Sequence, residues 1–307
     1  MLLFSENQFR NLVTADQVIQ AIRAAFTRDF PSTLRMPART SLQLDGAVLL
    51  IMPCYDPAMN AAGVKLVSVS KRGVHADYEL LDPATGIPVA RIEADYLTDL
   101  RTAATSAVAT DLLARPDAKT LGVFGSGRQA LAHLVVLPRV RRFERFLVCG
   151  SGRSGLAEFC ARMEAEHGIK VEPVTPEICA READVICTCT TAAQPLFDGR
   201  GLRPGAHLNL VGAFQPHTRE VDDETVCRAR VVVDTYEGAL AEAGDLLLPM
   251  ASGVIARSHI VADLHEIASG KKKVRASPQD ITLFKSVGCA LEDLAAAQLA
   301  YQCVRLD

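Results

Sequence analysis

Residues 121–130 read LGVFGSGRQA, an apolar run that leads into a glycine-rich turn and then into an apolar, helix-like segment. The turn has the pattern G-x-G-x-x-A. In a strand–turn–helix unit, Gly125 allows the tight turn, Gly127 lets the backbone approach a pyrophosphate, and Ala130 lets the helix pack closely on the strand. The N-terminus of such a helix directs free N–H groups and a positive dipole at the phosphates. The stretch therefore predicts a dinucleotide-binding unit; the alternative is a glycine turn in an α/β domain that binds no nucleotide.

The chain around this turn alternates between strand-like and helix-like segments. Strand-like apolar runs occupy residues 120–124, 145–149, 169–174, 183–190, 206–211 and 230–234. Alternation at this spacing is typical of a parallel sheet with helices on both faces. We therefore expect an α/β fold with a Rossmann-type doubly wound parallel sheet. The apolar period from Asp280 to about Val304 predicts a C-terminal amphipathic helix.

The first hundred residues have a mixed pattern that predicts a separate α/β domain. Thr14 and Gln17 form a capping box ahead of an apolar-periodic stretch, which predicts a helix from about 15 to 28. Strand-like runs follow at residues 47–52, 63–70, 76–81 and 87–93. The turn sequence DPATG joins the last two runs, so we expect an antiparallel hairpin there. From Thr98 the apolar period becomes helical, and Pro116 ends it.

Length and charge limit the classes of protein. The chain has 307 residues, which at roughly 150 residues per domain suggests two domains. Lysine and arginine total 33 and aspartate and glutamate total 36, so the formal net charge is −3. This balance excludes a strongly basic nucleic-acid binder and an acidic disordered chain. No apolar run approaches the roughly 18 residues that span a membrane, and the N-terminus lacks the pattern of a secretory signal.

The cysteines indicate the redox compartment. There are nine, spread irregularly, and Cys187 and Cys189 form the one close pair. The odd number and the sparse spacing argue against a disulfide framework and favour reduced thiols in the cytoplasm. Cys189 in a buried strand is expected to be an inert hydrophobic residue. No group of His, Cys or Asp residues has the spacing of metal ligands, so we expect no metal.

The residues after the second strand of the alternating region bear on the identity of the dinucleotide. A site specific for NAD usually places an acidic residue there, on the ribose 2′-hydroxyl. This chain instead has Ser151, Arg153 and Ser154, whose hydroxyls and guanidinium suit a 2′-phosphate. We therefore favour NADP(H), with NAD(H) as the other option. The alternative for Arg153 is that its side chain is simply solvated.

The next strand ends carry small or hydroxylated residues. Thr190 follows the fourth strand, and Gly212, Ala213 and Phe214 follow the fifth. Ligands of doubly wound sheets bind beyond the carboxyl ends of the strands. These residues are therefore candidates to lie along a nicotinamide ribose, although Thr190 would serve equally as a cap of its strand.

Several further segments form a recognisable series. They are MPAR (36–39), GVK (63–65), LTDLRTAA (97–104), the glycine turn, VGA (211–213) with Pro216 and RE (219–220), EAGDL (242–246) and FKSVG (284–288). Together, and in this order, they resemble the ornithine cyclodeaminase/mu-crystallin family. The resemblance implies that residues 1–116 and 286–307 form a domain with the dimer interface and much of the substrate site. Residues 117–285 would form the dinucleotide-binding Rossmann domain.

The resemblance also implies roles for three cations. Arg39 and Arg101 correspond to arginines that hold the substrate carboxylate, which a guanidinium fork can bind at two points. Lys65 corresponds to a lysine near the reacting carbon, and we assign it the catalytic role. Without the resemblance, Lys65 would be taken as a strand lysine that reaches solvent and Arg101 as a surface residue. The motif and the resemblance together give these cofactor-binding candidates: Arg101, Thr102, Gly125, Ser126, Gly127, Arg128, Gln129, Ser151, Arg153, Ser154, Thr190, Val211, Gly212, Ala213 and Ser286.

The chain departs from the cyclodeaminase pattern at three places. Cyclodeaminases have an aspartate, thought to accept a proton, where this chain has Phe214, and a phenyl ring cannot do acid–base work. They tend to have Phe-Asp-Ser where this chain has Lys285 between a phenylalanine and a serine, which is closer to mu-crystallin and the reductases. The loop at residues 70–75 is short, and Gly73 stands where a cofactor-contacting threonine is usual.

The resemblance, with these departures, favours NAD(P)H-dependent reduction of a cyclic imine carboxylate. The substrates would be Δ1-pyrroline-2-carboxylate or Δ1-piperideine-2-carboxylate, and the products L-proline or L-pipecolate. Lys65 would protonate the imine nitrogen; alternatively the imine arrives protonated and Lys65 only orients the carboxylate. Phe214 would be an apolar wall for the ring. His75 is a weaker candidate for the proton donor than a structural histidine.

Other functions stay open from the sequence. Ornithine cyclodeamination and an alanine-type amino-acid dehydrogenation are the alternatives within the family. An NADP-bound carrier of a small ligand, of the mu-crystallin type, is the alternative outside catalysis. The expected assembly is a homodimer that acts on a small imino or amino acid, with no nucleic-acid or membrane partner.

Overall fold

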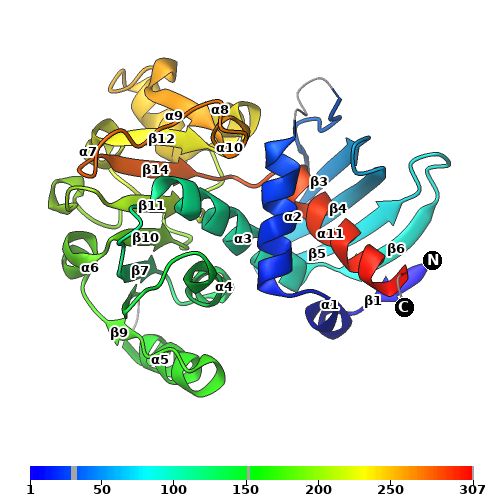
Figure 1. Ribbon diagram of the computed structural model, residues 1–307, viewed down its shortest axis with the longest axis horizontal. Helices are drawn as coiled ribbons and strands as arrows, with labels where there is room; N and C mark the ends of the chain where they lie inside the picture. Colours follow the sequence, from blue (N-terminus) through cyan, green and yellow to red (C-terminus); the bar gives the residue numbers. More distant parts are fainter. Residues whose placement is uncertain (29–32, 151–152, 306–307) are drawn as a thin grey trace. The chain divides into compact units, whose positions relative to one another are not determined.

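The computed structural model describes residues 1–28, 33–150 and 153–305. The chain divides into two compact units, which we call the first unit (Met1–Thr105 with Cys289–Asp307) and the second unit (Ser106–Gly288). Figure 1 follows the chain through both. The first division falls within the helix α3 (Asp95–Leu113), earlier than the boundary near residue 116 that the sequence suggested, so this helix belongs to both units.

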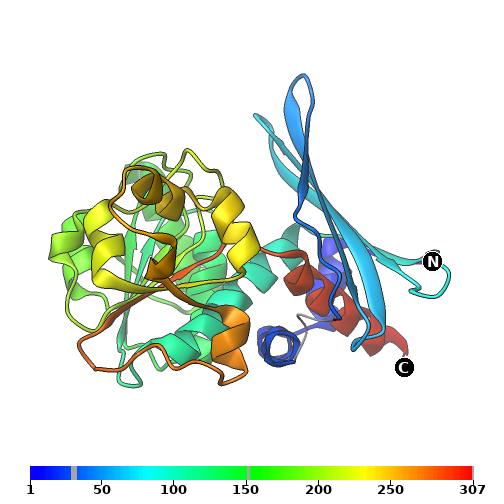
Figure 2. The same ribbon diagram turned by 90° about the horizontal axis from the view of Figure 1, so that it is seen from above.

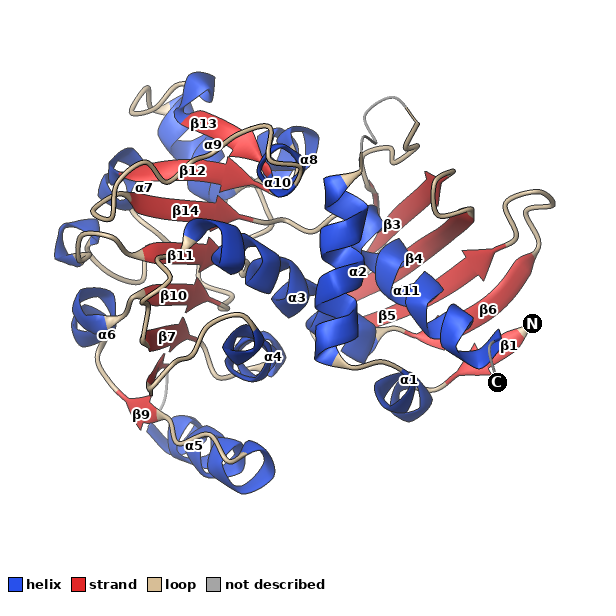
Figure 3. Ribbon diagram, in the orientation of Figure 1, coloured by secondary structure: helices blue, strands red, loops and turns tan. Residues whose placement is uncertain are grey.

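The second unit is built on an eight-stranded sheet in which every strand pair is parallel. Its spatial order is β13-β12-β14-β11-β10-β7-β8-β9 (Figure 3). The strands are β7 (Thr120–Phe124), β8 (Arg145–Cys149), β9 (Glu172–Pro173), β10 (Val185–Thr188), β11 (His207–Leu210), β12 (Ala229–Val233), β13 (Ile260–Asp263) and β14 (Ile281–Lys285). Helices lie on both faces of the sheet (Figure 2). This is the Rossmann-type doubly wound fold that the alternation predicted, and the prediction is confirmed.

The strand order reverses direction beside β7. The chain first moves outward from β7 through β8 to β9 and then returns to place β10 on the other side of β7. In open α/β sheets the crevice outside the carboxyl ends at such a switch point is where ligands bind. The helices of this unit are α4 (Arg128–Val136), α5 (Arg153–His167), α6 (Pro176–Glu182), α7 (Asp223–Arg228), α8 (Tyr236–Glu242), α9 (Gly244–Ala251) and α10 (Leu264–Ala268).

One expected element is wrong. The sequence predicted a helix from Asp280 to Val304, whereas the structure has the strand β14 and then the helix α11 (Ala290–Arg305). Every residue of β14 is buried, because the strand lies between β11 and β12 inside the sheet. A strand buried on both faces has no alternation of apolar and polar residues, so periodicity alone does not separate it from a buried helix. β13 was missed as well.

The first unit contains a six-stranded sheet of spatial order β1-β6-β5-β4-β3-β2. Its strands are β1 (Leu2–Phe4), β2 (Thr40–Gln43), β3 (Ala47–Asp56), β4 (Ala61–Ser70), β5 (Gly73–Leu81) and β6 (Pro88–Glu93). All neighbours are antiparallel except β1 and β6. The expected hairpin is present as β5 and β6, and at its turn the Asp82 carboxylate accepts hydrogen bonds from two backbone N–H groups. The short elements β1, α1 (Glu6–Leu12) and β2 were not predicted.

Helices cover one face of this sheet. The helix α2 (Ala15–Thr27) has the predicted capping box, in which Thr14 and Gln17 exchange hydrogen bonds between side chain and backbone. Its apolar stripe is buried, and α11 packs beside α2 and against β3 and β4. In Figure 3 both helices lie on the same side of the sheet. None of the helices in the described part of the chain has the length and apolar character needed to cross a bilayer.

Candidate active site

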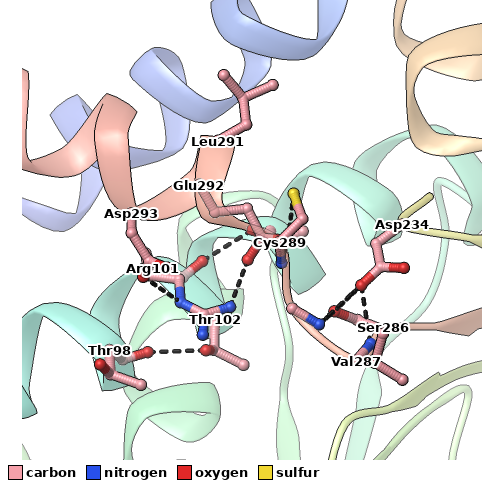
Figure 4. Close-up of polar contacts among 12 residues, drawn as sticks. Thr98, Arg101, Thr102, Asp234, Ser286, Val287, Cys289, Leu291, Glu292 and Asp293 are labelled. Carbon is pink, nitrogen blue, oxygen red and sulfur yellow. Dashed lines mark hydrogen bonds and ion pairs between the residues drawn. The ribbon is translucent and has the colours of Figure 1, made fainter. Parts of the chain in front are cut away.

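A buried cluster of charges lies in the first unit, where β4, α3 and α11 meet. Lys65 on β4 is 1 % exposed, and its Nζ lies 2.7 Å from Oδ1 of Asp293. The guanidinium of Arg101 on α3 reaches two carboxylates: its Nε lies 2.9 Å from the same Asp293 oxygen, and its Nη1 lies 2.5 Å from Oε2 of Glu292 (Figure 4). The structure thus brings together Lys65 and Arg101, two of the three cations that the sequence singled out.

The two carboxylates come from the first turn of α11, far along the chain from the cations. Glu292 and Asp293 are both completely buried. Acidic residues are favoured in the first turn of a helix because the helix dipole is positive there. Sequence reasoning missed both residues. The available signal was that two acids interrupt the apolar run at residues 289–297, which is unusual for a buried stretch unless a partner of opposite charge is present.

The surroundings of Lys65 perturb its acidity. Burial and the positive charge of Arg101 lower its pKa from 10.5 to about 8, against the opposing effect of the Asp293 carboxylate. Burial also acts against the charge of Arg101, but Asp293 and Glu292 outweigh it and raise the pKa of the guanidinium. Arg101 therefore stays charged, while Lys65 is protonated near neutral pH and can release its proton readily. Such a group suits general acid catalysis.

Tyr78 is a further member of this site that sequence reasoning did not identify. It stands directly opposite Lys65 in the pairing of β4 with β5, so the two side chains share a face. Its ring packs on Gly63, where an added Cβ would lie 2.3 Å from the tyrosine hydroxyl. The hydroxyl is buried and has no hydrogen-bond partner among the described residues. Burial and the nearby Asp293 raise its pKa, so it remains a proton-bearing donor.

Two other candidates are placed by the strand register. Arg39, which is half-buried, directly precedes β2. Continuing the β2–β3 register by one residue sets Arg39 level with Met52, the partner of Lys65 across β3 and β4. His75, by contrast, pairs with Ser68, so it lies on the face opposite to Lys65, and its side chain is 75 % exposed beside Asp95. The structure does not bring His75 to the cluster.

The glycine turn of the second unit fits a dinucleotide. Gly125 follows β7 with φ +113°, and an added Cβ there would lie 2.5 Å from a backbone oxygen. Gly127 is the N-cap of α4 and makes no side-chain cap, and an added Cβ at Gly127 would meet nothing within 4 Å. The space beside Gly127 at the start of α4 is therefore open, as the close approach of a pyrophosphate requires. Ser126, Arg128 and Gln129 lie on this turn and the first helical turn.

The buried Glu220 bonds to residues at the carboxyl ends of both β10 and β11. The backbone N–H and the hydroxyl of Thr190 both donate to Oε1 of Glu220, at 2.8 and 2.7 Å. Thr190 thus makes the hydrogen bonds of a strand-end cap, which is one of the two roles that the sequence left open. Phe214 is half-buried and packs against the apolar core of this unit.

The remaining cofactor candidates have these positions. The Ser286 hydroxyl donates to Oδ2 of Asp234 at 2.9 Å, and the same oxygen accepts the backbone N–H groups of Val287 and Gly288 (Figure 4). The Thr102 hydroxyl donates to the Thr98 carbonyl one turn earlier in α3. Ser151 lies outside the described residues, as do the side chains of Arg153 and Ser154.

The two units together define a class of protein: a two-unit α/β protein with a Rossmann-type dinucleotide fold and a buried lysine–arginine–carboxylate cluster. Comparison with known proteins gives the particular family. The family model described as ornithine cyclodeaminase/mu-crystallin family matches residues 2–306, so the chain belongs to this family.

Individual relatives match along almost their whole length. The chain is 35 % identical to a Δ1-pyrroline-2-carboxylate reductase of Bacillus cereus, over 98 % of this chain and 96 % of that protein. It is 35 % identical to the mouse ketimine reductase mu-crystallin, over 92 % of this chain and 90 % of that protein. Among solved structures, the Thermococcus litoralis Δ1-pyrroline-2-carboxylate reductase in complex with NADH and L-proline superimposes with a TM-score of 0.96 at 37 % identity, over 100 % of this chain and 98 % of that one.

Proposed function

We propose that the protein is an NAD(P)H-dependent reductase of a cyclic imine carboxylate and converts Δ1-pyrroline-2-carboxylate to L-proline. The observation that carries this proposal is the buried cluster in which Lys65, with a pKa of about 8, lies beside the permanently charged Arg101. The names of the Bacillus, mouse and Thermococcus relatives support the same reaction. Δ1-Piperideine-2-carboxylate, reduced to L-pipecolate, is the second substrate we propose.

In the proposed mechanism Lys65 holds a proton at Nζ until the substrate accepts it. A reduced nicotinamide cofactor, which the glycine turn at residues 125–130 would hold, would supply a hydride for the C=N carbon. Lys65 donates its proton to the imine nitrogen, and the product is a secondary amine. Because the pKa of Lys65 is lowered mainly by burial and by Arg101, this proton is available near neutral pH. Asp293 accepts a hydrogen bond from Nζ at 2.7 Å and so keeps the amine oriented.

The carboxylate of the substrate needs cationic partners. Arg101 already binds two carboxylates of the protein, through Nε and Nη1. Among the described residues no carboxylate pairs with its third nitrogen, Nη2, so we propose that Nη2 binds the substrate carboxylate. Arg39, one residue before β2 and level with Lys65 by strand register, is the proposed second partner. A planar carboxylate held between two guanidinium groups would be fixed in orientation as well as in place.

The test is to follow NADPH and NADH oxidation with both cyclic imines. We expect turnover with at least one imine, and loss of most of kcat in Lys65→Met with the fold intact. Absence of oxidation of either cofactor would overturn the proposal. Formation of NAD(P)H from alanine, or release of ammonia from ornithine, would favour the alternative family reactions. Tight cofactor binding without turnover would favour a carrier. Phe214, whose phenyl ring cannot accept a proton, is proposed as an apolar wall for the ring of the substrate.

The second part of the proposal is a preference for NADP(H). It rests on two features of the sequence: no acidic residue follows β8 directly, and Ser151, Arg153 and Ser154 do. A guanidinium and two hydroxyls suit a 2′-phosphate. The ratio of kcat/KM for NADPH and NADH tests this preference directly.

The third part is that two copies of the chain assemble through the uncovered face of the first unit's sheet. Leu42 and Leu66 share this face by register through β3, and they are 50 % and 37 % exposed. Exposed large apolar side chains on one face favour association. We expect a dimer by light scattering and a monomer after Leu66→Glu. We also place the protein in the cytoplasm, which agrees with the free thiols of its cysteines.

A further inference from the structure

The loop after β11 is held by an unusual buried carboxylate. Glu220 has no exposed surface, and both of its oxygens accept hydrogen bonds. Besides Thr190, its donors are the Thr188 hydroxyl at 2.7 Å and the backbone N–H groups of Gly212 and Ala213 at 2.9 and 3.2 Å. Glu220 therefore joins the carboxyl ends of β10 and β11 through one side chain.

A second pair of charges holds the same loop. Nζ of Lys285, at the end of β14, lies 2.9 Å from Oδ2 of Asp245 and donates to the carbonyl of Ala213 at 2.5 Å. Oδ1 of Asp245 accepts the backbone N–H groups of Glu220 and Val221 at 2.7 and 3.1 Å. All three charged side chains are completely buried. We call Glu220, Asp245 and Lys285 the buried clamp.

The buried clamp occupies both backbone groups of Ala213, the residue that precedes Phe214. Its N–H is used by Glu220 and its carbonyl by Lys285. Gly212 is packed so tightly that an added Cβ would lie 2.2 Å from the Thr190 carbonyl oxygen and 2.4 Å from Oε1 of Glu220. The loop therefore has little freedom to shift, and the N–H groups of Gly212 and Ala213 are not available to a ligand.

Stability alone is a poor reason for this arrangement. Taking charges out of water costs several kcal/mol per ion, and apolar residues of similar volume often serve a core equally well. Burial raises the pKa of Glu220, although Lys285 acts in the opposite direction. Keeping this carboxylate charged in the interior therefore lowers the stability of the fold. What the charges supply is geometry: hydrogen bonds with charged groups are short and directional.

We propose that Glu220, Asp245 and Lys285 are positioning residues that hold Ala213 and Phe214 in one geometry, so that this loop offers substrate and nicotinamide an apolar surface on which the N–H groups of Gly212 and Ala213 are already bonded. The inference rests on the proposed imine reduction, for which an apolar ring is the substrate. On this proposal the loop favours substrates with an apolar ring over amino acids with a polar or charged side chain. None of the three side chains is proposed to touch the substrate.

The first measurement needs no substrate. Hydrogen exchange of residues 211–215 in the cofactor-free protein reports opening of the loop. Lys285→Met removes the cation but keeps most of the length of the side chain, and Thr188→Val removes a single hydroxyl donor to Glu220. We expect the Gly212 and Ala213 amides to exchange about tenfold or more faster in Lys285→Met and less so in Thr188→Val, since each lost bond to a charged group is worth roughly that much.

The matched control is Asp184→Asn. Asp184 is also a nearly buried carboxylate, and it accepts hydrogen bonds from Arg115 and two backbone N–H groups at the amino end of β10, the end away from the loop. This variant should lower thermal stability without changing exchange in the loop or kcat. It separates a general loss of stability from loss of the clamp.

The kinetic measurement tests the positioning role. In Lys285→Met, kcat for the imine should fall about tenfold or more, with a smaller change in KM, because positioning acts on the transition state. Thr188→Val, whose folding is less at risk, should show a smaller loss of the same kind. Loop amides that exchange at the wild-type rate would overturn the clamp itself. Faster exchange with unchanged kcat would overturn its role in positioning. If the protein reduces no imine, the amide exchange rates still show whether the buried clamp restrains the loop. Failure of the proposed function and failure of the clamp therefore give different results.

Discussion

Replacing Lys65 by methionine should make the protein more stable at neutral pH while it removes activity. Lys65 is 1 % exposed, and its surroundings lower its pKa from 10.5 to about 8, chiefly through burial and Arg101. Each pKa unit corresponds to about 1.4 kcal/mol. The charged form of Lys65 therefore lowers the free energy of unfolding by about 3 kcal/mol relative to the neutral form. Methionine has similar length and no charge, and Asp293 keeps its contact with Arg101.

The pH dependence has a definite sign. Below about pH 8 both the folded and the unfolded chain hold the Lys65 proton, so the full cost is present. Between about 8 and 10.5 the folded protein releases the proton while the unfolded chain retains it, so stability rises with pH in this window. Relative to Lys65→Met, the wild type should therefore gain about 3 kcal/mol as the pH rises through this window.

The assay is urea unfolding of both proteins at a series of pH values, with the exposed Lys119→Met as the control. The side chain of Lys119 is 61 % exposed, so its removal should leave the pH profile of stability unchanged. A difference between wild type and Lys65→Met that stays constant across the window would refute the reasoning, because it would mean that Lys65 titrates alike in the folded and unfolded chain.

Three further predictions concern the same sites. The kcat for imine reduction should fall as the pH rises through about 8, where Lys65 loses its proton. In Asp293→Asn this fall should begin at lower pH, because the carboxylate that raises the pKa of Lys65 is gone. A pH profile of kcat that is the same in Asp293→Asn as in the wild type would contradict the assignment of Lys65. Tyr78→Phe should raise the unfolding free energy by about 1–3 kcal/mol in denaturant titrations, since it deletes a buried hydroxyl without a partner among the described residues; a loss of stability would reveal a partner. Gly125→Ala should destabilise the protein by about 1–3 kcal/mol, because the φ of +113° at this residue is unfavourable for alanine. Gly127→Ala should change the free energy of unfolding by no more than about 0.5 kcal/mol. It should nevertheless weaken the binding of NADH, which can be measured by fluorescence.

Local features of the fold could be predicted because their signals are local. The capping box of Thr14 and Gln17, the hairpin turn at Asp82 and the strands on either side of the glycine turn depend on residues close together in the chain. The strand β14 could not be distinguished from a helix, because a strand in the middle of a parallel sheet is buried on both faces and its sequence carries no alternation. β1 and β2 are too short for a period to appear.

The cations of the site were identified through the resemblance to the family, but their partners were not. The carboxylates that pair with Lys65 and Arg101 come from α11, with Asp293 228 residues after Lys65 and Glu292 191 residues after Arg101. Nothing in the local sequence indicates such a pairing, because it depends on the path of the whole chain. The orphan hydroxyl of Tyr78 likewise depends on the register of β4 against β5 and on the space above Gly63.

The sequence by itself determined the dinucleotide turn, the family and the residue types that carry charge. It also drew attention to Phe214 and Lys285 as two separate departures from the cyclodeaminase pattern. Only the tertiary structure connects them, since Lys285 holds the carbonyl of Ala213, the residue before Phe214. The physical reason is that periodicity and turn chemistry act over a few residues, whereas burial, counter-charges and hydrogen-bond partners are set by which distant segments the folded chain places in contact.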